Sequence, residues 1–243
     1  MSADVQIVGW GSRIMDSIKG VLVGLVMFVA SFALLFWNEG RAVHTAQALE
    51  EGAASVVSVA ADKIDPANEN KLVHVSAVAV AADTLRDKAL GIDAPGALRL
   101  ARAVSMYQWK ENKKTTKRKR VGGSEERVTT YSYEKVWSDR LIDSNKFNEA
   151  AQHPNPKQMA VSSKTFDANA VTVGAFTLPE AMLRELPAIM PLPATATALA
   201  ALPAGIKDRA KLDDGRIYVG TNPADPNVGD LRIAFRTLPS GPV

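Results

Sequence analysis

GVLVGLVMFVASFALLFW, residues Gly20–Trp37, is a run of 18 residues without a charged side chain. At a rise of about 1.5 Å per residue, such a helix is about 27 Å long, close to the roughly 30 Å hydrocarbon core of a bilayer. A helix on the surface of a soluble protein carries a polar stripe along the face that meets water. This run has no such stripe, and it therefore predicts a transmembrane helix over residues 20–37.

Residues on both sides of this run suit the two surfaces of a membrane. Trp10, Phe36 and Trp37 are predicted to lie at headgroup level, and Arg41 follows at the exit from the bilayer. Basic residues and the amino terminus precede the run, whereas two acidic residues follow Arg41 on the other flank. We therefore expect an integral membrane protein with a cytoplasmic N-terminus. Its main domain is then extracytoplasmic: periplasmic, or in a eukaryote on the luminal side of the endoplasmic reticulum or inner nuclear membrane.

A cleaved secretory signal is the alternative to a permanent anchor. Ala46-Gln47-Ala48 has the small-x-small form of a cleavage site, and basic residues precede the apolar run. The run is longer than a usual signal core, however, and the Ala-x-Ala lies well beyond Trp37. These spacings favour the uncleaved anchor.

Gly20 and Gly24 form a G-x-x-x-G pattern within the apolar run. Small residues at this spacing let the backbones of two membrane helices approach closely. The same spacing also arises by chance in Gly-rich apolar runs. We interpret Gly20 and Gly24 as a helix-packing face, either for another copy of the chain or for other spans of the same protein.

The fold class predicted for the whole chain is α+β, with an N-terminal transmembrane helix and a mostly antiparallel β-rich domain. Residues 1–19 form the cytoplasmic or interfacial N-terminus, residues 38–52 a helical juxtamembrane stalk, and residues 53–243 the extracytoplasmic domain. Alternating apolar residues rich in β-branched side chains are typical of strands. They predict strands at Ser55–Ala60, Leu72–Ala81, Leu98–Trp109, Val128–Trp137, Val171–Leu178, Arg216–Gly220 and Leu231–Leu238. Short helices are predicted at Pro179–Leu186 and Ala194–Leu202.

Two aromatic-rich segments are predicted to form one long hairpin. Met106–Trp109 and Tyr131–Trp137 each place aromatic side chains at alternate positions, where they can meet across the strands. We expect these aromatic side chains to belong to the core. The connection between the two segments holds the basic octet KKTTKRKR and Gly122-Gly123.

The octet concentrates the positive charge of the chain. The whole chain has a net charge of +3, and the octet carries six positive charges, so the rest is net negative. One interpretation is a contact surface for anionic lipid headgroups or nucleic acid. The other is a solvated hairpin tip, which we favour because the expected orientation keeps this loop away from DNA, and we expect no nucleic-acid partner. The six residues are Lys113, Lys114, Lys117, Arg118, Lys119 and Arg120.

Composition and motifs exclude several kinds of catalytic site. The chain has no Cys, which excludes disulfides and thiolate chemistry, while 47% hydrophobic and 23% charged residues are typical of a chain that folds. His44, His74 and His153 are not at metal-ligand spacing, and no phosphate-cradling loop is present. Asp139 and Asp143 could serve as an acid–base pair in principle, but spacing without a pocket carries little weight. We therefore expect no catalytic residues, no metal and no cofactor.

Seven sequence blocks together resemble the transmembrane protein 43 family, also called LUMA. In order they are SFALLFWNEGRAVHTAQALEEG, DPANENKLVHVSA, LRLARAVSMYQWKE, YSYEKVWSDRLIDSNKF, HPNPKQMAV, VGAFTL and NPADPNVGDLRIAF, and they cover nearly the whole chain. The resemblance implies one N-terminal span, a large luminal domain and further spans near the C-terminus. For eukaryotic members it also implies self-association in the endoplasmic reticulum and inner nuclear envelope, with lamins and emerin as partners.

The chain differs in two ways from the eukaryotic members of this family. The sequence stops at Val243 without a further apolar span, which suggests truncation before the C-terminal membrane spans of the family. An Ala-rich composition and the lack of an Asn-x-Ser/Thr sequon suggest a prokaryotic member, in which lamin and emerin would not be available.

Three functional hypotheses follow. The leading one is a non-enzymatic membrane-anchored scaffold that forms a homo-oligomer and contacts membrane lipid and other membrane or envelope proteins. The alternative is a membrane-tethered binding module for a lipid or envelope component, which uses the basic octet or an apolar groove. The third, a membrane-tethered hydrolase that uses Asp, Glu or His, is disfavoured because no catalytic motif is present.

Overall fold

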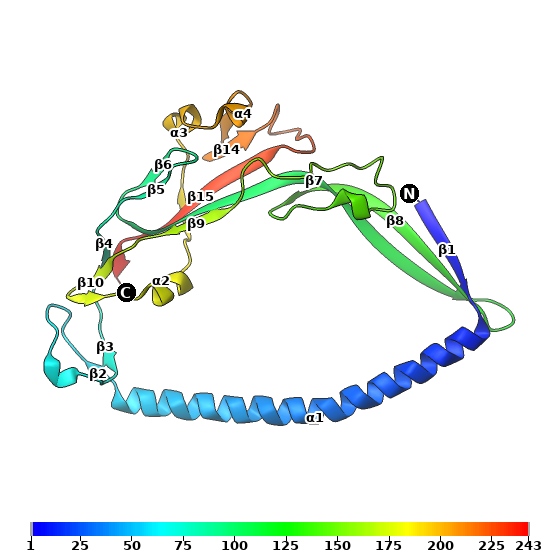
Figure 1. Cartoon of the computed structure of the whole chain (residues 1–243), viewed down its shortest axis with the longest axis horizontal. Coiled ribbons are helices and arrows are strands. Elements are labelled where there is room, and N and C mark those ends of the chain that lie inside the picture. The colour runs from blue at the N-terminus through cyan, green and yellow to red at the C-terminus, as the bar shows by residue number, and fades with distance from the viewer. Residues whose placement is uncertain (1, 243) are drawn as a thin grey trace. The chain divides into compact units, whose positions relative to one another are not determined.

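The computed structural model describes residues 2–242 and confirms the predicted α+β class (Figure 1). A long N-terminal helix, α1 (Trp10–Ser55), comes before a series of antiparallel strands. By the pattern of internal contacts, the chain divides into two compact units. The helix unit comprises Met1–Val57, Asn70–Val73 and Glu111–Ser132, and the sheet unit comprises Ser58–Glu69, His74–Lys110 and Tyr133–Val243.

Helix α1 is one uninterrupted helix of 46 residues. The sequence predicted a span over residues 20–37 that a helical stalk over residues 38–52 continues, and in the structure both belong to one helix, which already begins at Trp10. No proline occurs between residues 10 and 55, so nothing removes a backbone donor from the helix. The helix ends where Val56 and Val57 begin an extended segment, and the N–H of Val56 still donates to the carbonyl of Gly52 at 3.0 Å.

Strand β1 (Ser2–Val8) precedes the helix and was not predicted from the sequence. It pairs antiparallel with strand β8 (Glu125–Ser138), with Val5 opposite Val128 and Val8 opposite Glu125. The pairing continues from Ser2 to Val8 without a register shift, and Figure 1 shows β1 beside β8. A segment before the apolar helix is therefore hydrogen-bonded to a segment more than 115 residues further along the chain.

Strand β7 (Ala97–Lys119) and strand β8 form the predicted aromatic hairpin. The expectation that the basic octet lies in the connecting loop is wrong, because β7 continues through Lys119 and the connection is only a short turn. The hydroxyls of Thr115 and Thr129 lie 3.1 Å apart across the strands, and β-branched residues favour the extended backbone. Gly122 and Gly123 close the turn with φ angles of +90° and +82°. The end of the hairpin that belongs to the helix unit, Glu111–Ser132, is called the arm below.

The described strands of the two units are paired in four sheets. The largest sheet has the order β1-β8-β7-β15-β14-β13, with β12 also on β15 and β9 also on β7. Its further members are β9 (Lys164–Asp167), β12 (Met190–Leu192), β13 (Ala210–Asp213), β14 (Arg216–Val219) and β15 (Leu231–Pro239). A second sheet has the order β11-β10-β4-β16 and consists of β4 (Val78–Ala81), β10 (Val171–Val173), β11 (Phe176–Thr177) and β16 (Gly241–Pro242). Two-stranded ladders are formed by β2 (Val57–Ser58) with β3 (Val73–His74), and by β5 (Leu85–Asp87) with β6 (Ile92–Ala94).

The predicted bounds agree closely with the structure at β14 and β15, whereas β7 runs well beyond the predicted end at Trp109 and the predicted strand Val171–Leu178 is split into β10 and β11. The predicted strand Leu72–Ala81 is split into β3 and β4, and the predicted strand Ser55–Ala60 is reduced to β2 because α1 extends to Ser55. The two predicted short helices are present as α2 (Glu180–Glu185), which follows Pro179, and α3 (Ala196–Ala200), which Thr195 caps. A further short helix, α4 (Ala204–Lys207), and single 3₁₀ turns at Pro66–Asn68 and Ser144–Lys146 complete the described elements.

The core of the sheet unit follows the two-residue period of its strands. Along β7 the even-numbered residues from Leu98 to Gln108 are buried, and the odd-numbered residues after Ala97 are partly or fully exposed. The buried apolar side chains of β7 belong to one apolar cluster with those of its sheet neighbours β15 and β14, such as Ile233 and Ile217. This alternation stops at Lys110, and residues 113–119 of the strand are exposed throughout.

Buried and partly buried polar residues hold specific parts of the sheet unit together. Arg102 on β7 forms an ion pair with Asp87 on β5 at 2.6 Å, and both side chains are almost inaccessible to solvent. Asn155 accepts a hydrogen bond from the N–H of Trp109 at 2.8 Å and donates to the carbonyl of the same residue at 2.9 Å. These two hydrogen bonds hold the loop around Asn155 against β7. They satisfy the backbone N–H and carbonyl of Trp109, as a paired strand would.

The aromatic pairs predicted across the hairpin are present. The rings of Tyr107 and Trp137 lie 5.1 Å apart between centroids, a distance typical of paired aromatic side chains. His153 stacks on Tyr133 at 3.7 Å and meets Trp109 edge-on at 4.7 Å. His153 is therefore packed among aromatic side chains of the sheet unit.

Candidate membrane-contacting surface

Helix α1 exposes its apolar residues on all sides. Among the described residues, it is the one helix long and apolar enough to cross a membrane, and none of its apolar window is buried within the protein. Its mean hydropathy over that window is 2.4. An apolar surface of this extent is unfavourable in water, so the composition and exposure of α1 suit a lipid environment.

The predicted interfacial and packing residues lie along this exposed helix. Trp10, Phe36 and Trp37 are 64%, 82% and 66% exposed, and Arg41 is exposed one turn further on. A Cβ atom placed on Gly20 or Gly24 would meet nothing within 4 Å, so the backbone at both positions is open to an approaching helix. The placement of Trp10, Phe36, Trp37 and Arg41 at the membrane surface stays a prediction, and so does a contact between helices at Gly20 and Gly24.

The first turns of α1 contact the tip of the arm. Arg13 donates a hydrogen bond to the carbonyl of Gly123 and lies 3.9 Å from a carboxylate oxygen of Glu125. A Cβ atom on Gly123 would lie only 2.9 Å from Cδ1 of Trp10, so the indole packs directly against this glycine. With the β1–β8 pairing, these contacts place the arm tip beside the N-terminal end of the apolar helix.

Charges at this contact are arranged around Glu125. Arg127 donates to Glu125 at 2.8 Å and holds the pKa of that carboxyl below its ordinary value, aided by the charges of Lys117 and Arg13. On Glu126, a hydrogen bond from Arg120 at 2.8 Å lowers the pKa, and the charge of Arg118 lowers it further. The same pairing raises the pKa of Arg120. Both carboxylates of the tip are therefore ionised and already matched to cations.

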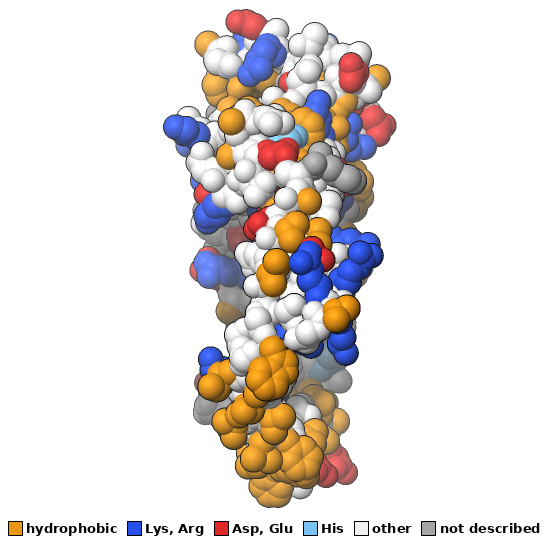
Figure 2. Space-filling model, turned by 90° about the vertical axis from the view of Figure 1, so that its right-hand side faces the viewer, with side chains coloured by type: hydrophobic (Ala, Val, Ile, Leu, Met, Phe, Trp, Pro, Cys, Tyr) orange, Lys and Arg blue, Asp and Glu red, His pale blue; other side chains and the backbone are white. Residues whose placement is uncertain are grey.

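The remaining cations of the octet extend from the arm into solvent. Lys113 lies over the ring of Tyr131 at 5.7 Å, in a cation–π contact. Within the described residues 2–242, no ion pair is formed by Lys114, Lys117, Arg118 or Lys119. In Figure 2, Lys and Arg side chains gather above the apolar side chains at the bottom of the view. The arm thus combines an excess of positive charge with a position next to the apolar helix.

The titratable residues considered from the sequence are not brought together as one site. His44 is exposed on α1, and His74 is exposed on β3. His153 is packed between aromatic rings, Asp139 is exposed, and Asp143 accepts a hydrogen bond from the N–H of Asn145 at 3.1 Å. Among the described residues, no group of three or more His, Asp or Glu side chains is placed to hold a metal ion.

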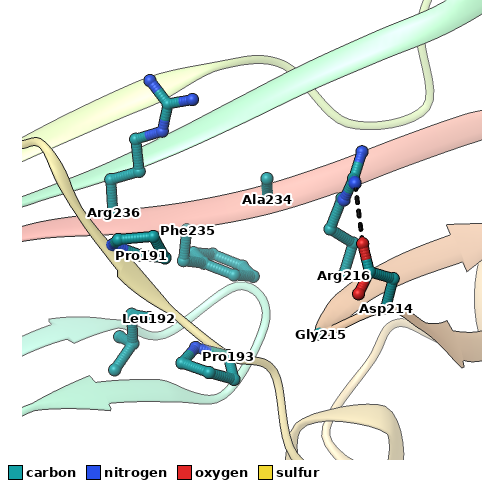
Figure 3. Close-up of a pocket in the computed structure, with 9 residues that line it drawn as sticks. All are labelled: Pro191, Leu192, Pro193, Asp214, Gly215, Arg216, Ala234, Phe235 and Arg236. Atoms are coloured by element: carbon teal, nitrogen blue, oxygen red, sulfur yellow. Dashed lines mark hydrogen bonds and ion pairs between the residues drawn. The ribbon is translucent and has the colours of Figure 1, made fainter.

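A cleft of about 380 Å³ lies in the sheet unit between β12, β14 and β15 (Figure 3). Pro191, Leu192 and Pro193 line one side, while Arg216 is engaged by Asp214 at 3.1 Å. The guanidinium groups of Arg216 and Arg236 point away from Leu192 and Pro193 (Figure 3). The nine lining residues include no nucleophile with a neighbouring base, so the cleft offers apolar contact and charge but no proton-transfer pair.

Comparison with known proteins identifies the family. The sequence model of a family described as Transmembrane protein 43 matches residues 106–243. The chain belongs to the transmembrane protein 43 family. It is 36% identical to Transmembrane protein 43 of Rattus norvegicus and 35% identical to that of Homo sapiens, over 237 residues and 93% of this chain in each case. The Transmembrane protein 43 homolog of Drosophila melanogaster is 31% identical over 88% of this chain.

The chain spans about 55% of the length of the rat and human relatives. No solved structure matches it. Family membership confirms the resemblance of the sequence blocks and agrees with a membrane protein that has an N-terminal membrane helix.

The contact between β1, α1 and the arm was missed by the sequence analysis. Ser2–Val8 is short and has only a weak alternating pattern, ADVQIV, which a period-two search from the first residues could have detected. Its partner on β8 could not have been found in this way, because pairing between distant segments depends on the course of the chain between them.

Proposed function

We propose that this chain is a membrane-anchored scaffold without enzymatic activity, which self-associates through α1 and through its β-rich domain. Its partners are membrane lipid, other copies of the chain and other membrane proteins. The observation that carries the proposal is the exposed apolar surface of α1, together with the open backbone at Gly20 and Gly24.

The geometry of α1 supports a specific packing face. Successive residues of an α-helix are rotated by about 100°, so Gly20 and Gly24 lie within about 40° of each other. Without side chains, both positions allow a second helix to come within van der Waals contact of the backbone. A second copy presents the same pair of glycines, and a symmetric contact is the commonest form of homodimer.

The test is chemical crosslinking of the full chain in membranes. We expect a crosslinked dimer or larger species for the wild type, and its loss when Gly20→Leu and Gly24→Leu are combined. The matched control is Ala33→Leu, because residue 33 lies in the same apolar run on about the opposite face of the helix. Its added volume is close to that of either single Gly→Leu substitution, so each single glycine variant is compared with it, and it should leave the crosslinked species unchanged.

Two results would count against the proposal. Recovery of monomer only, for wild type and variants alike, would show that the chain does not self-associate in membranes. Equal loss of crosslinking in Ala33→Leu would show that any added volume disturbs insertion, and that Gly20 and Gly24 form no particular face.

The second candidate function is a membrane-tethered module that binds a lipid component. It is favoured by the exposed cations of the arm, which the scaffold proposal leaves without a role.

A further inference from the structure

Strand β7 has an unpaired edge along the arm. On one side β7 is paired with β15, and this pairing ends at Met106. On its other side the arm part of β7 is paired with β8. Among the residues that the structure describes, no strand is paired with the outer edge of residues 113–119, and all of these residues are exposed. This stretch is called the free edge below.

The backbone groups of alternate residues face the free edge. The N–H of Arg120 donates to the carbonyl of Ser124 at 2.9 Å, so the even-numbered residues of β7 direct their backbone groups toward β8. Odd-numbered residues point to the opposite side, as Tyr107 does when its N–H donates to the carbonyl of Asp230 at 2.9 Å. The residues that direct N–H and carbonyl groups to the free edge are therefore Lys113, Thr115, Lys117 and Lys119.

Cations lie on both faces of the arm beside this edge. Successive side chains of a strand point to opposite faces, so Lys117 and Lys119 lie on one face, while Lys114 and Arg118 lie on the other. Within the described residues 2–242, none of these four side chains forms an ion pair. The free edge thus combines a row of unpaired backbone groups with unneutralised positive charge on each face.

An extended acidic segment of a polypeptide matches both features. A strand added to an exposed edge forms main-chain hydrogen bonds, and its side chains select the edge to which it binds. The Cβ atoms of neighbouring strands are about 4.5–5.5 Å apart, so carboxylates on the added strand would reach the cations of β7. Because these cations lie on both faces, adjacent acidic residues match the edge better than acidic residues at every second position.

Other ligands match only one of the two features. A second copy of β7 would place basic side chains opposite basic side chains, which destabilises strand pairing, and lysines on an edge generally discourage such contacts. A nucleic acid or an anionic headgroup would neutralise the cations, but its phosphates have no donors for the carbonyl groups of the edge. The row of backbone groups therefore favours a polypeptide over another polyanion.

We propose that the free edge of β7 binds an extended acidic segment of a partner protein as an additional strand. The partner segment carries adjacent Asp or Glu residues, whose carboxylates pair with the cations on both faces of the arm. The proposal deepens the proposed function and rests on its scaffold role, because it gives the scaffold a class of partner. It requires neither self-association through α1 nor a particular orientation of α1 in the membrane.

The first experiment compares two acidic peptides on the full chain in nanodiscs of phosphatidylcholine. The fluorescent peptides EETTEETT and ETETETET have the same composition and charge, but only the first places carboxylates on both faces of a strand. Fluorescence anisotropy measures the Kd of each. We expect EETTEETT to bind about 2- to 10-fold more tightly, because it pairs with cations on both faces. Equal binding of the two peptides, or tighter binding of ETETETET, would overturn the proposal.

A proline substitution separates the backbone edge from charge. Thr115→Pro removes an N–H that faces the free edge, but keeps every charge and every N–H that faces β8. It should weaken binding of EETTEETT by about 10-fold or more. Thr115→Val, which keeps the N–H, is the matched control and should bind as the wild type does. Wild-type affinity in Thr115→Pro would show that charge alone holds the peptide and would overturn the proposal.

Charge at the free edge is tested by two sets of substitutions. Binding of EETTEETT should be lost when four cations of the arm are neutralised together, and it should persist when four exposed lysines outside the arm are neutralised. Equal loss in both sets would show a general effect of net charge and would overturn the proposal. The first set is Lys114→Gln, Lys117→Gln, Arg118→Gln and Lys119→Gln, and the second is Lys63→Gln, Lys71→Gln, Lys88→Gln and Lys157→Gln.

Amide hydrogen exchange tests the edge in the wild type, without any substitution in the arm. Saturating EETTEETT should slow exchange at the N–H groups of Thr115, Lys117 and Lys119, which face the free edge. The N–H groups of Thr116 and Arg118 face β8 and should change less. Unchanged exchange at the three odd-numbered positions would overturn the proposal even if Thr115→Pro disturbed the fold of the arm.

Two other polyanions complete the comparison. An RNA oligonucleotide and vesicles that contain phosphatidylserine should bind more weakly than EETTEETT, and their binding should be insensitive to Thr115→Pro. If either bound more tightly than the peptide, the free edge would belong to nucleic acid or to lipid, and the proposal would be wrong. Nanodiscs that hold a single chain keep this result separate from self-association, which the crosslinking experiment measures.

Discussion

Arg13, in the second turn of α1, donates a hydrogen bond to the backbone carbonyl of Gly123, which lies 110 residues further along the chain. This contact ties the apolar helix, which the sequence predicts, to a hairpin turn whose position against that helix the sequence does not predict. Gly123 accepts the bond with a φ of +82°, in the left-handed region. The indole of Trp10 covers the same residue.

We predict that Gly123→Ala loosens the contact between β1 and the arm more than Gly122→Ala does. Both substitutions place alanine at positive φ, which costs about 1–2 kcal/mol. Only at position 123 does the new Cβ also meet Trp10, at 2.9 Å, whereas nothing lies within 4 Å at position 122. Amide hydrogen exchange of Ser2–Val8 measures the difference, and equal exchange in the two variants would contradict the packing of Trp10 on this turn.

We also predict that the arm loses stability in acid. The pKa values of Glu125 and Glu126 are lowered in the folded state, chiefly by hydrogen bonds from Arg127 and Arg120. A lowered folded pKa stabilises the fold above the unfolded carboxyl value of about 4.3, and this contribution disappears as the pH falls through the folded pKa.

Hydrogen exchange in the arm, followed from neutral pH to below pH ~4, should therefore show protection that decreases with acidification. Combined Glu125→Gln and Glu126→Gln should lower protection at neutral pH and remove most of this pH dependence. Because the pairs are solvent-accessible, added salt should weaken the effect in the wild type. Protection that is independent of pH in the wild type would show that these ion pairs contribute nothing to the arm.

A third prediction concerns the buried ion pair between Asp87 and Arg102. Asp87→Ala leaves the guanidinium of Arg102 buried without a carboxylate, and loss of one partner of such a pair costs about 3–5 kcal/mol. The exposed pair between Asp93 and Arg86, at 2.7 Å, provides the control. Asp93→Ala should change the free energy of unfolding by about 1 kcal/mol or less.

Denaturant unfolding of the full chain in detergent, monitored by tryptophan fluorescence, compares these two variants. If the denaturant midpoints of unfolding were similar for Asp87→Ala and Asp93→Ala, the prediction would be wrong, and the pair between Asp87 and Arg102 would be accessible to water. The prediction depends on burial alone, since both pairs join an arginine to an aspartate at similar distance.

The sequence predicted the helix and most strands because these depend on local patterns. The run Gly20–Trp37 has no charged residue, and apolar residues alternate with others along the whole of Leu98–Trp109. The octet was misplaced in a loop because charged residues are unfavourable in most strands. In β7 the hydrogen bonds to the neighbouring strand hold the basic residues in an extended conformation. Because these residues are exposed, their charges stay hydrated and no free energy is lost by burying them.

The candidate surface could be predicted only in part. The cations of the arm and the aromatic residues that flank the apolar run are visible in the sequence, but Arg13, Gly123 and Glu125 carry no motif that joins them. Their role depends on contact between segments far apart in the chain.

The sequence by itself determined that an apolar helix precedes a β-rich chain, because hydrophobicity and its period are properties of neighbouring residues. Only the tertiary structure decided that Ser2–Val8 completes a sheet with the arm, and that Trp10 and Arg13 meet the turn at Gly123. Backbone hydrogen bonds are chemically alike in every strand, so local sequence does not specify which distant edge a short strand will join.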